Sequence, residues 1–304
     1  MSHPSVRGLR ALPRPVAWVF TGGGARAAAQ VGMAEVLREQ GLAPDLVVGS
    51  STGAINAVGL SGGGAGPESL REAWRLIGTE SSLASLGSAA VRAFAPGRTG
   101  RSAREFREIL ARVIAGDPRQ SVPADLCVVA SDLVGGSPVP QRTGPLIDAL
   151  TASASLPVVF PPVERDGMLL IDGGLTAGAP LDQALDAGAA SIVLLDTGAS
   201  AVAEQTAAAM RWWQIAGLAY SHQIRGQLGH ALVRTGEQVS VLTISTDEGG
   251  QLDFTRPDDH FSTGRSATSR ALAHGLGSGV TGPGVYGIPA GFETDPRLAD
   301  LLVE

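Results

Sequence analysis

The chain has 304 residues, of which 44% are apolar and 17% are charged, and its formal net charge is −6. This composition is typical of a globular rather than a disordered chain, long enough to bury a sizeable core, and the acidic balance gives no reason to expect a nucleic-acid-binding protein. All 23 basic residues are arginine, so catalysis by a lysine, through a Schiff base or a Ser-Lys dyad, is excluded.

Cysteine content and hydropathy bear on the cellular compartment of the protein. Its single cysteine, Cys127, cannot form an internal disulfide, which fits a reducing compartment, and it is typical of a small buried strand residue. No apolar stretch approaches the ~18 residues of a membrane span, and the short run Val16–Phe20 is a poor signal peptide. We therefore expect a cytoplasmic protein, with residues 1–14 as a loose leader and residues 15–304 as one domain.

Two units of strand, glycine turn and helix occupy the first 60 residues. The apolar runs Val16–Phe20 and Leu46–Val48 predict strands, and helices are predicted from Ala25 and over Ala54–Leu60. The later elements, in chain order, are helices around 69–77, 82–94 and 101–115, strands at Leu126–Ser131 and Pro138–Pro140, and then helix Leu146–Ser155, strand Met168–Ile171, helix Pro180–Ala187, strand Ser191–Asp196, helix Glu204–Arg234, strand Val239–Ser245 and helix Phe261–Gly275. This alternation predicts an α/β fold with a parallel or mixed sheet covered on both faces, while the Gly- and Pro-rich tail after Gly277 gives no prediction.

The segment Gly49-Ser50-Ser51-Thr52-Gly53 follows the second strand and matches the Gly-x-Ser-x-Gly pattern of a nucleophile elbow. In such a turn the glycines let strand and helix approach closely, and the serine stands at a helix N-terminus that favours developing negative charge. Because glycine, serine and alanine are abundant here, the pattern alone also fits a chance match, and its position between strand and helix favours the elbow. Ser50 is a weaker candidate, because Val48 stands two residues before it.

A second glycine-rich turn, Gly22-Gly23-Gly24-Ala25-Arg26-Ala27, joins the first strand to the first helix. Several backbone N–H groups can point at one anion there, which in a hydrolase is the oxyanion of the tetrahedral intermediate. The spacing also fits a dinucleotide-binding fingerprint, but the second strand lacks the carboxylate that this motif requires at its end. Arg26 is either a solvated first-turn arginine or a residue that holds the loop or an anionic head group.

Two kinds of base are available to a catalytic serine. Asp172-Gly173-Gly174 follows the predicted strand Met168–Ile171, which places the carboxylate at a strand end, although Asp-Gly pairs are also common in ordinary turns. A Ser-His-Asp hydrolase is the alternative, but that fold usually has several strands before its elbow, and one precedes it here. The histidines that could serve it are His222, His230, His260 and His274. An aspartate base needs a raised pKa, so the Ser-Asp hypothesis predicts a tight, apolar, glycine-walled pocket.

The glycine loop, the elbow and the Asp-Gly-Gly turn, taken in this order, resemble the patatin-like phospholipase family. Flanking segments add to the resemblance: Ala152-Ser153-Ala154-Ser155-Leu156-Pro157 and Phe160-Pro161-Pro162-Val163 before the aspartate, and Ala179-Pro180-Leu181, Gly188-Ala189 and Val193-Leu194-Leu195-Asp196 after it. The resemblance covers residues 16–200, with a fainter continuation to about residue 275.

This resemblance implies a three-layer α/β/α fold with a mostly parallel central sheet, and it makes residues 15–304 a hydrolase domain. The implied activity is hydrolysis of acyl esters in lipids, of the phospholipase A, lysophospholipase or esterase type, without a metal or an organic cofactor. Ser51 is the implied nucleophile and Asp172 the base, with the amides of Gly22, Gly23 and Gly24 as the oxyanion hole. The implied supporting residues are Arg26, Gly49, Thr52, Gly53, Gly173 and Gly174. The implied partner is a lipid or acyl-ester substrate, with room for transient contact with a membrane surface and no role for nucleic acid.

One position departs from the family pattern, because Ala27 stands where glycine usually follows the arginine. Alanine is favoured if this position lies in the first helical turn, which we expect, whereas a positive φ would distort the oxyanion hole. Ala27 and the apolar stretch around Trp212-Trp213 motivate an alternative function: a catalytically weak or inactive relative that binds lipid or a protein partner. The tryptophan pair itself favours a core position over membrane contact.

Overall fold

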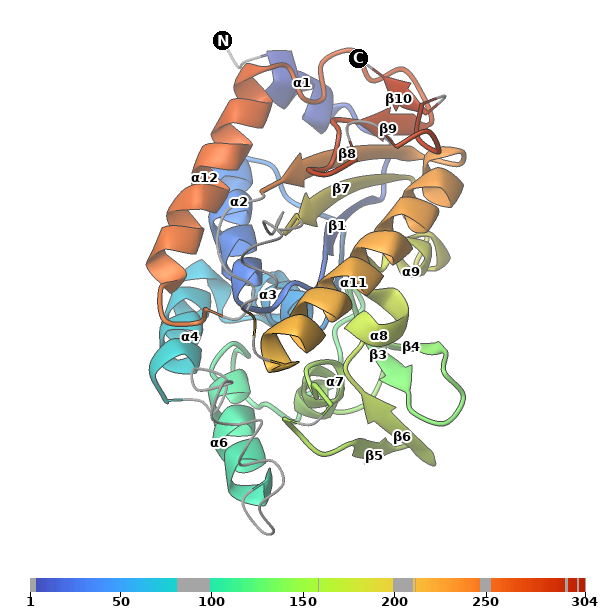
Figure 1. Cartoon of the computed structure of the whole chain (residues 1–304). Helices are drawn as coiled ribbons and strands as arrows, with labels where there is room; N and C mark the ends of the chain where they lie inside the picture. The colour runs from blue at the N-terminus through green and yellow to red at the C-terminus, as the bar shows by residue number, and fades with distance from the viewer. Residues whose placement is uncertain are drawn as a thin grey trace.

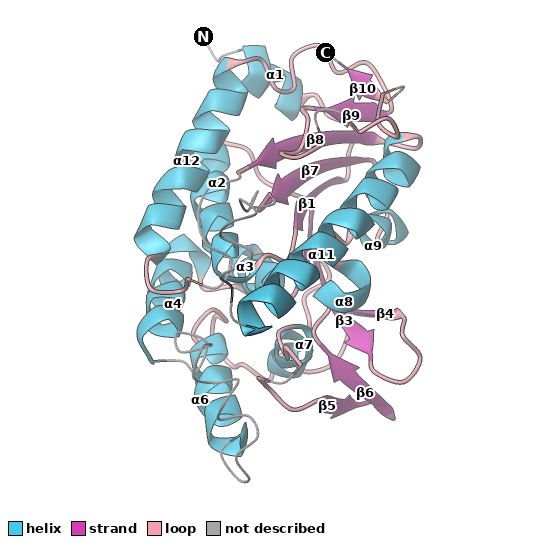
Figure 2. Ribbon diagram, viewed as in Figure 1, coloured by secondary structure: helices cyan, strands magenta, loops and turns pink. Residues whose placement is uncertain are grey.

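We describe the protein from a computed structural model, which describes residues 4–80, 99–157, 159–198, 210, 212–246, 253–292, 295–299 and 301–303. Within these ranges the chain forms a ten-stranded sheet with helices on both faces, so that three layers stack as α/β/α (Figure 1, Figure 2). No helix in these ranges is both long and apolar enough to cross a lipid bilayer. The predicted fold class is confirmed.

The sheet is parallel over most of its width. Its strands follow the order β10-β9-β8-β7-β1-β2-β3-β6-β5, in which β6 and β5 are antiparallel, and β4 pairs with β3, also antiparallel. The strands are β1 (Val16–Phe20), β2 (Leu46–Ser50), β3 (Leu126–Asp132), β4 (Pro138–Gln141), β5 (Val163–Arg165), β6 (Met168–Ile171), β7 (Ser191–Asp196), β8 (Ser240–Ser245), β9 (Gly284–Tyr286) and β10 (Leu302–Val303). Because β1 and β2 are parallel neighbours, the turns that follow them meet at one edge of the sheet.

Strand β6 brings Asp172 to the same edge. It pairs with the carboxyl end of β3, where Ser131 lies opposite Ile171. Because β6 is antiparallel, the chain runs back along β3 and leaves the strand near Val129, which in turn pairs with Ser50 of β2. The Asp-Gly-Gly turn and the serine elbow therefore lie on either side of β3.

The first helical layer covers one face of the sheet, on the left and at the bottom of Figure 1. Its helices are α2 (Ala28–Glu39), α3 (Thr52–Leu60), α4 (Gly66–Glu80), α6 (Thr99–Ala111), α7 (Leu146–Ser153) and α12 (Pro257–Ala273), with the short helix η1 (Gly24–Ala27) before α2. Helices α2 and α12 approach closely through glycines. A Cβ at Gly32 would lie 2.1 Å from the carbonyl oxygen of Phe261, and one at Gly264 would lie 1.8 Å from that of Ala29.

The second layer, on the opposite face, consists of α8 (Gly174–Ala177), α9 (Leu181–Asp186) and α11 (Trp212–Gly236). Alternation along β1 shows the two faces: Trp18 and Phe20 belong to the core of the first layer, and Ala17 and Val19 to the core of the second. Cys127 is buried in this second core, and burial raises the pKa of its thiol to about 11. The cysteine is therefore a core residue of β3, as predicted.

Residues 4–10, which we expected in a loose leader, form helix α1 (Pro4–Arg10) instead. Val6 and Leu9 are buried, and the Ser5 hydroxyl donates a hydrogen bond of 2.6 Å to the carbonyl of Leu272 in α12. Apolar side chains three residues apart give this short segment a face to bury, so it packs on the domain. The division of the chain at residue 14 stays a prediction.

Some predicted elements lie outside the described residues, and two observed strands were not predicted. The helix predicted at 82–94, the first part of the helix predicted at Glu204–Arg234, and the side chains of Trp212 and Trp213 lie outside the described residues. The tail after Gly277 contains β9 and β10, which the sequence did not predict. These strands have three and two residues, too few to show a hydrophobic period.

Candidate active site

Ser51 occupies the turn between β2 and α3, with φ 56° and ψ −132°. A non-glycine residue in this left-handed region is strained by about 1–3 kcal/mol, and such strain is concentrated at functional turns. The flanking glycines permit the turn, because a Cβ at Gly49 would lie 2.6 Å from the Ala57 Cβ, and one at Gly53 would lie 2.5 Å from the Phe20 carbonyl oxygen. The segment thus has the strand–turn–helix geometry expected of an elbow, with Ser51 only 5% exposed.

The carboxylate of Asp172 lies directly against this serine. Ser51 Oγ donates a hydrogen bond of 2.7 Å to Asp172 Oδ2. The other carboxylate oxygen, Oδ1, accepts one from the Tyr220 hydroxyl at 2.7 Å and one from the Gly174 N–H at 2.8 Å. Asp172 is 2% exposed, so these three donors provide its solvation in place of water.

Backbone contacts fix the Asp172 turn against β3 and the end of α7. The Asp172 N–H donates to the Ser155 carbonyl at 3.0 Å, and the Ser131 hydroxyl donates to the Asp172 carbonyl at 2.8 Å. A Cβ at Gly173 would lie 2.0 Å from the Val129 carbonyl oxygen, so a side chain at this position would force the turn away from β3. The absence of a side chain at Gly173 therefore allows the turn, and with it the Asp172 carboxylate, to lie close to β3.

The pKa of Asp172 is raised above its ordinary value. Burial is the main cause, and the hydrogen bonds from Tyr220, Ser51 and Gly174 act in the opposite direction. A raised pKa makes the carboxylate a stronger base, which the Ser-Asp hypothesis requires. The surroundings are tight and glycine-walled as predicted, but they are not wholly apolar, because Tyr220 contributes a hydroxyl.

The glycine loop after β1 lies against the elbow. A Cβ at Gly22 would come within 3.2 Å of the Ser51 Cβ, so the absence of a side chain allows this contact. The Gly22 N–H already donates to the Gly178 carbonyl at 2.8 Å, which argues against the oxyanion-hole role predicted for it. Gly23 and Gly24 stand at the start of η1, where amides have no intrahelical acceptor, and their oxyanion role stays a prediction.

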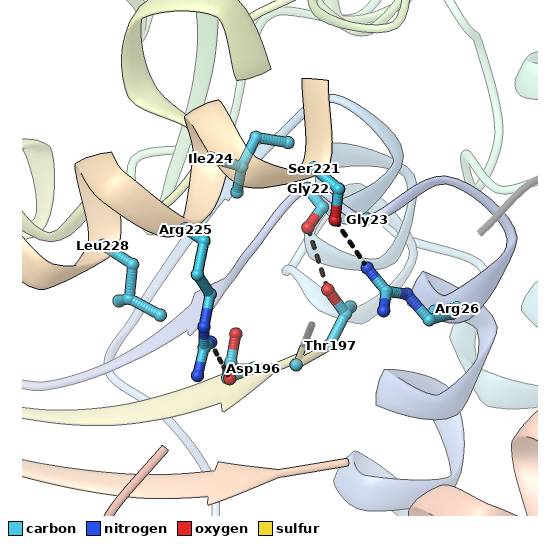
Figure 3. Close-up of a pocket in the computed structure, with 10 residues that line it drawn as sticks. Gly22, Gly23, Arg26, Asp196, Thr197, Ser221, Ile224, Arg225 and Leu228 are labelled. Atoms are coloured by element: carbon cyan, nitrogen blue, oxygen red, sulfur yellow. Dashed lines mark hydrogen bonds and ion pairs between the residues drawn. The ribbon is translucent and has the colours of Figure 1, made fainter. Parts of the chain in front are cut away.

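Arg26 and Ala27, the last two residues of this loop, are both buried. Ala27 has φ −61° and ψ −18°, so the helical conformation expected at this departure from the family pattern is confirmed. Arg26 is 1% exposed and donates from Nη2 to the Ser221 hydroxyl of α11 at 3.2 Å (Figure 3). Burial lowers the pKa of Arg26, and Asp196 opposes this shift. Arg26 is thus not a solvated arginine, and it links the loop to α11.

The two residues beside Ser51 in the elbow are also buried. The hydroxyls of Ser50 and Thr52 form no hydrogen bond to the described residues. The Ser50 side chain lies near Gly173, where an added Cβ would come within 2.6 Å of its Oγ. Of the two adjacent serines, therefore, Ser51 is the one that hydrogen-bonds to the carboxylate.

Tyr220 is the member of this site that the sequence did not single out. It lies on α11, far along the chain from the three glycine motifs, and no local pattern distinguishes it from a core tyrosine. A buried aspartate needs hydrogen-bond donors, and a tyrosine hydroxyl can be one of them. Because the chain has 2 tyrosines, this requirement was the one signal in the sequence that could have pointed to Tyr220.

The histidines are placed elsewhere. His222 and His230 are exposed on α11, His274 is exposed at the end of α12, and His260 is buried in α12 with a pKa lowered by burial. Among the residues that the structure describes, no histidine hydrogen-bonds to Ser51. The Ser-His-Asp alternative therefore has no geometric support in this part of the chain.

The cavities of about 10 and 490 Å³ in the described part of the chain do not include the Ser51–Asp172 pair. One of about 10 Å³ lies behind the glycine loop, between Gly22, Arg26 and Arg225 (Figure 3), and has room for about one water molecule. The other, of about 490 Å³, lies between α12, the segment after it, the carboxyl end of β8 and the segment that follows β9. Neither cavity is therefore evidence for where a substrate would bind at Ser51.

Similarity to known proteins agrees with the motif order. The sequence profile of the patatin-like phospholipase family matches residues 18–185, which include the glycine loop, Ser51 and Asp172. An uncharacterized NTE family protein of Mycobacterium tuberculosis is 31% identical over 182 residues, or 60% of this chain and 49% of the relative. A second one from the same species is 29% identical over 167 residues, or 55% of this chain and 27% of the relative. The chain thus spans half or less of these curated relatives.

A solved structure also aligns with the chain. VipD from Legionella pneumophila matches with a TM-score of 0.40 and 11% identity, over 86% of this chain and 67% of VipD.

Proposed function

Because this chain belongs to the patatin-like phospholipase family, we propose that it hydrolyses acyl esters of lipids, with Ser51 as nucleophile and Asp172 as base. One observation carries the proposal: the 2.7 Å hydrogen bond from Ser51 Oγ, on a strained turn, to the buried Asp172 carboxylate. Nucleophile and base within hydrogen-bonding distance are the signature of activated-serine catalysis.

The proposed reaction has two stages. In the first, Ser51 Oγ forms a bond to the acyl carbon while its proton moves to Asp172 Oδ2. The ester C–O bond then breaks, and the proton on Asp172 passes to the departing alcohol. In the second stage Asp172 takes a proton from water, the hydroxide attacks the acyl-enzyme, and the fatty acid leaves as Ser51 Oγ regains a proton.

The charge that develops on the acyl oxygen needs donors. The amides of Gly23 and Gly24 are the proposed pair, since Gly22 is engaged with Gly178. One donor of this kind contributes about 10²- to 10³-fold in rate. A positive φ at Ala27 would have distorted the loop and favoured a catalytically weak relative. The helical conformation of Ala27 supports the hydrolase proposal instead.

A fluorophosphonate probe, which phosphonylates activated serines, tests the proposal. We expect the wild type and the Ser50→Ala control to be labelled, and Ser51→Ala to remain unlabelled. Hydrolysis should be measured on a panel of phospholipid, lysophospholipid and neutral ester, with Asp172→Asn folded and inactive. Equal labelling of wild type and Ser51→Ala, or no hydrolysis of any ester by the wild type, would overturn it.

A further inference from the structure

We propose that Tyr220 is a positioning residue of the Ser51–Asp172 pair: the Tyr220 hydroxyl holds the Asp172 carboxylate in the orientation that accepts the proton of Ser51. The inference rests on the proposed function, because it assigns a role within that pair. Tyr220 lies beyond residues 18–185, the span matched by the family profile.

The two oxygens of Asp172 face different partners. Oδ2 accepts from Ser51 at 2.7 Å, while Oδ1 accepts from Tyr220 at 2.7 Å and from the Gly174 N–H at 2.8 Å. Two donors on Oδ1 restrict rotation of the carboxylate and leave Oδ2 directed at the serine hydroxyl. Positioning of this kind lowers the barrier because the reacting atoms are already aligned.

The second glycine of the Asp-Gly-Gly turn makes room for the tyrosine. A Cβ at Gly174 would lie 2.2 Å from the Tyr220 hydroxyl oxygen and 3.0 Å from Asp172 Oδ1. Any side chain at this position would therefore displace Tyr220 from the carboxylate. The Asp-Gly-Gly turn thus leaves space for the Tyr220 hydroxyl of α11 beside the Asp172 carboxylate.

Helix α11 is fixed against the segment that follows Asp172. The Gly178 N–H donates to Gln227 Oε1 at 2.8 Å, and the side-chain amides of Gln223 and Gln227 donate to the Leu175 carbonyl at 2.6 and 2.7 Å. Residues 220, 223 and 227 share one helical face, so these bonds also fix Tyr220. A tyrosine on an anchored helix can hold a carboxylate, whereas one on a loose segment could not.

The electrostatics agree with this geometry. Burial, and then the charge of Asp172, raise the pKa of Tyr220 well above its ordinary value, so its hydroxyl keeps its proton and remains a donor. Burial raises the pKa of Asp172, and the hydrogen bond from Tyr220 is the largest influence that lowers it. In the described part of the chain, Tyr220 is the titratable side chain that faces Asp172. The other polar groups that contact the Asp172 carboxylate are the Ser51 hydroxyl and the Gly174 amide. Loss of the tyrosine hydroxyl should therefore raise the pKa of Asp172.

Tyr220→Phe tests the inference in the full chain. The matched control is Tyr286→Phe, which removes the only other tyrosine hydroxyl, one that donates to the Gly282 carbonyl in the tail. We expect kcat to fall about 10- to 100-fold in Tyr220→Phe, as for loss of a hydrogen bond to a charged group. We also expect the acid limb of its kcat/KM profile to move to higher pH, with neither effect in Tyr286→Phe. A fall in kcat with the limb unmoved would indicate a packing role and overturn the inference.

A second experiment covers the case in which Tyr220→Phe does not fold. In the Tyr286→Phe background Tyr220 is the sole tyrosine, so 3-fluorotyrosine can be incorporated at that position alone. Fluorine makes the phenol a stronger donor, and the acid limb should then move to lower pH. An unchanged limb overturns the inference.

A measurement without substrate separates this inference from the proposed function. The pKa of the Asp172 carboxyl, followed by carbon NMR, should be higher in Tyr220→Phe than in the wild type. If it rises while the wild type neither reacts with the fluorophosphonate nor hydrolyses any ester, Tyr220 holds the carboxylate and the proposed function is wrong. If the enzyme is active and this pKa does not change, the inference about Tyr220 is wrong.

Discussion

The backbone N–H of Ser51 donates a hydrogen bond of 3.0 Å to the hydroxyl of Ser153, at the end of α7. The same hydroxyl donates to the Val129 carbonyl at 2.6 Å, and the Ser153 carbonyl accepts the N–H of Gly173 at 3.1 Å. A single buried residue therefore ties the elbow, β3 and the Asp172 turn together. The alignment of serine and aspartate depends on this connection as well as on their own hydrogen bond.

Ser153→Ala should weaken both folding and catalysis. The substitution leaves the Ser51 N–H and the Val129 carbonyl without their side-chain partner, and buried unsatisfied groups cost about 1–3 kcal/mol. Urea unfolding and the rate of fluorophosphonate labelling would measure the two effects. Ser155→Ala is the control, because that hydroxyl bonds within its own segment, to the Thr151 carbonyl. A labelling rate equal to that of the wild type would contradict the connecting role of Ser153.

Asp172→Asn should stabilise the fold relative to the wild type, and increasingly so as the pH rises. The folded protein raises the pKa of Asp172, so it binds this proton more tightly than the unfolded chain does. The wild type is therefore most stable below the ordinary aspartate pKa and loses stability as pH rises through the folded pKa. Asparagine does not titrate and lacks this loss. Urea unfolding between about pH 4 and pH 8 would test the sign, and a difference that stays constant with pH would contradict it.

Two glycine-to-alanine substitutions should have opposite effects on stability. Gly173→Ala places a Cβ 2.0 Å from the Val129 carbonyl oxygen, a clash with backbone that we expect to cost at least about 2 kcal/mol and to abolish labelling of Ser51. Gly226→Ala, on the exposed side of α11, has no atom within 4 Å of the new Cβ. It should stabilise the protein by up to about 1 kcal/mol through helix propensity. Thermal unfolding of both variants checks the signs, and destabilisation by Gly226→Ala would contradict this description of α11.

Arg225→Met should destabilise the attachment of α11 to the sheet. Arg225 Nη1 lies 3.0 Å from Asp196 Oδ2, with side chains only 12% and 4% exposed (Figure 3). The guanidinium also lies 4.1 Å from the centre of the Phe292 ring. Removal of the cation leaves a buried carboxylate without its counter-ion, which costs about 3–5 kcal/mol. Arg234→Met, also on α11, breaks the exposed ion pair with Asp182 of α9 and should cost no more than about 1 kcal/mol. Equal losses of unfolding free energy in the two variants would count against this difference.

Much of the architecture could be predicted because the decisive signals are local. Strand β1 is a continuous apolar run and β2 begins with one, and the nearby glycines mark the turns that a parallel sheet brings to one edge. Gly49 also has a local cause, since a Cβ there would meet atoms of the helix that follows it. The order of the three motifs then limited the choice of family.

The remaining features depend on distant contacts that leave no periodic pattern. Tyr220 acquires its place from the way α11 crosses the sheet, and the Gly22 amide is engaged by Gly178, more than 150 residues away. Helix α1 likewise takes its place from contact with Leu272. Each of these depends on tertiary packing, which a reading of successive residues does not contain.

The left-handed backbone of Ser51 bears on how such a chain changes over generations. Glycine is the less strained residue in that conformation, so a Ser51→Gly mutation removes the proposed nucleophile while it relieves the strain of the turn. Selection for stability alone would therefore favour glycine at this position. The proposed nucleophile thus occupies a position where stability alone favours glycine, and a relative without hydrolytic activity is expected to carry another residue there.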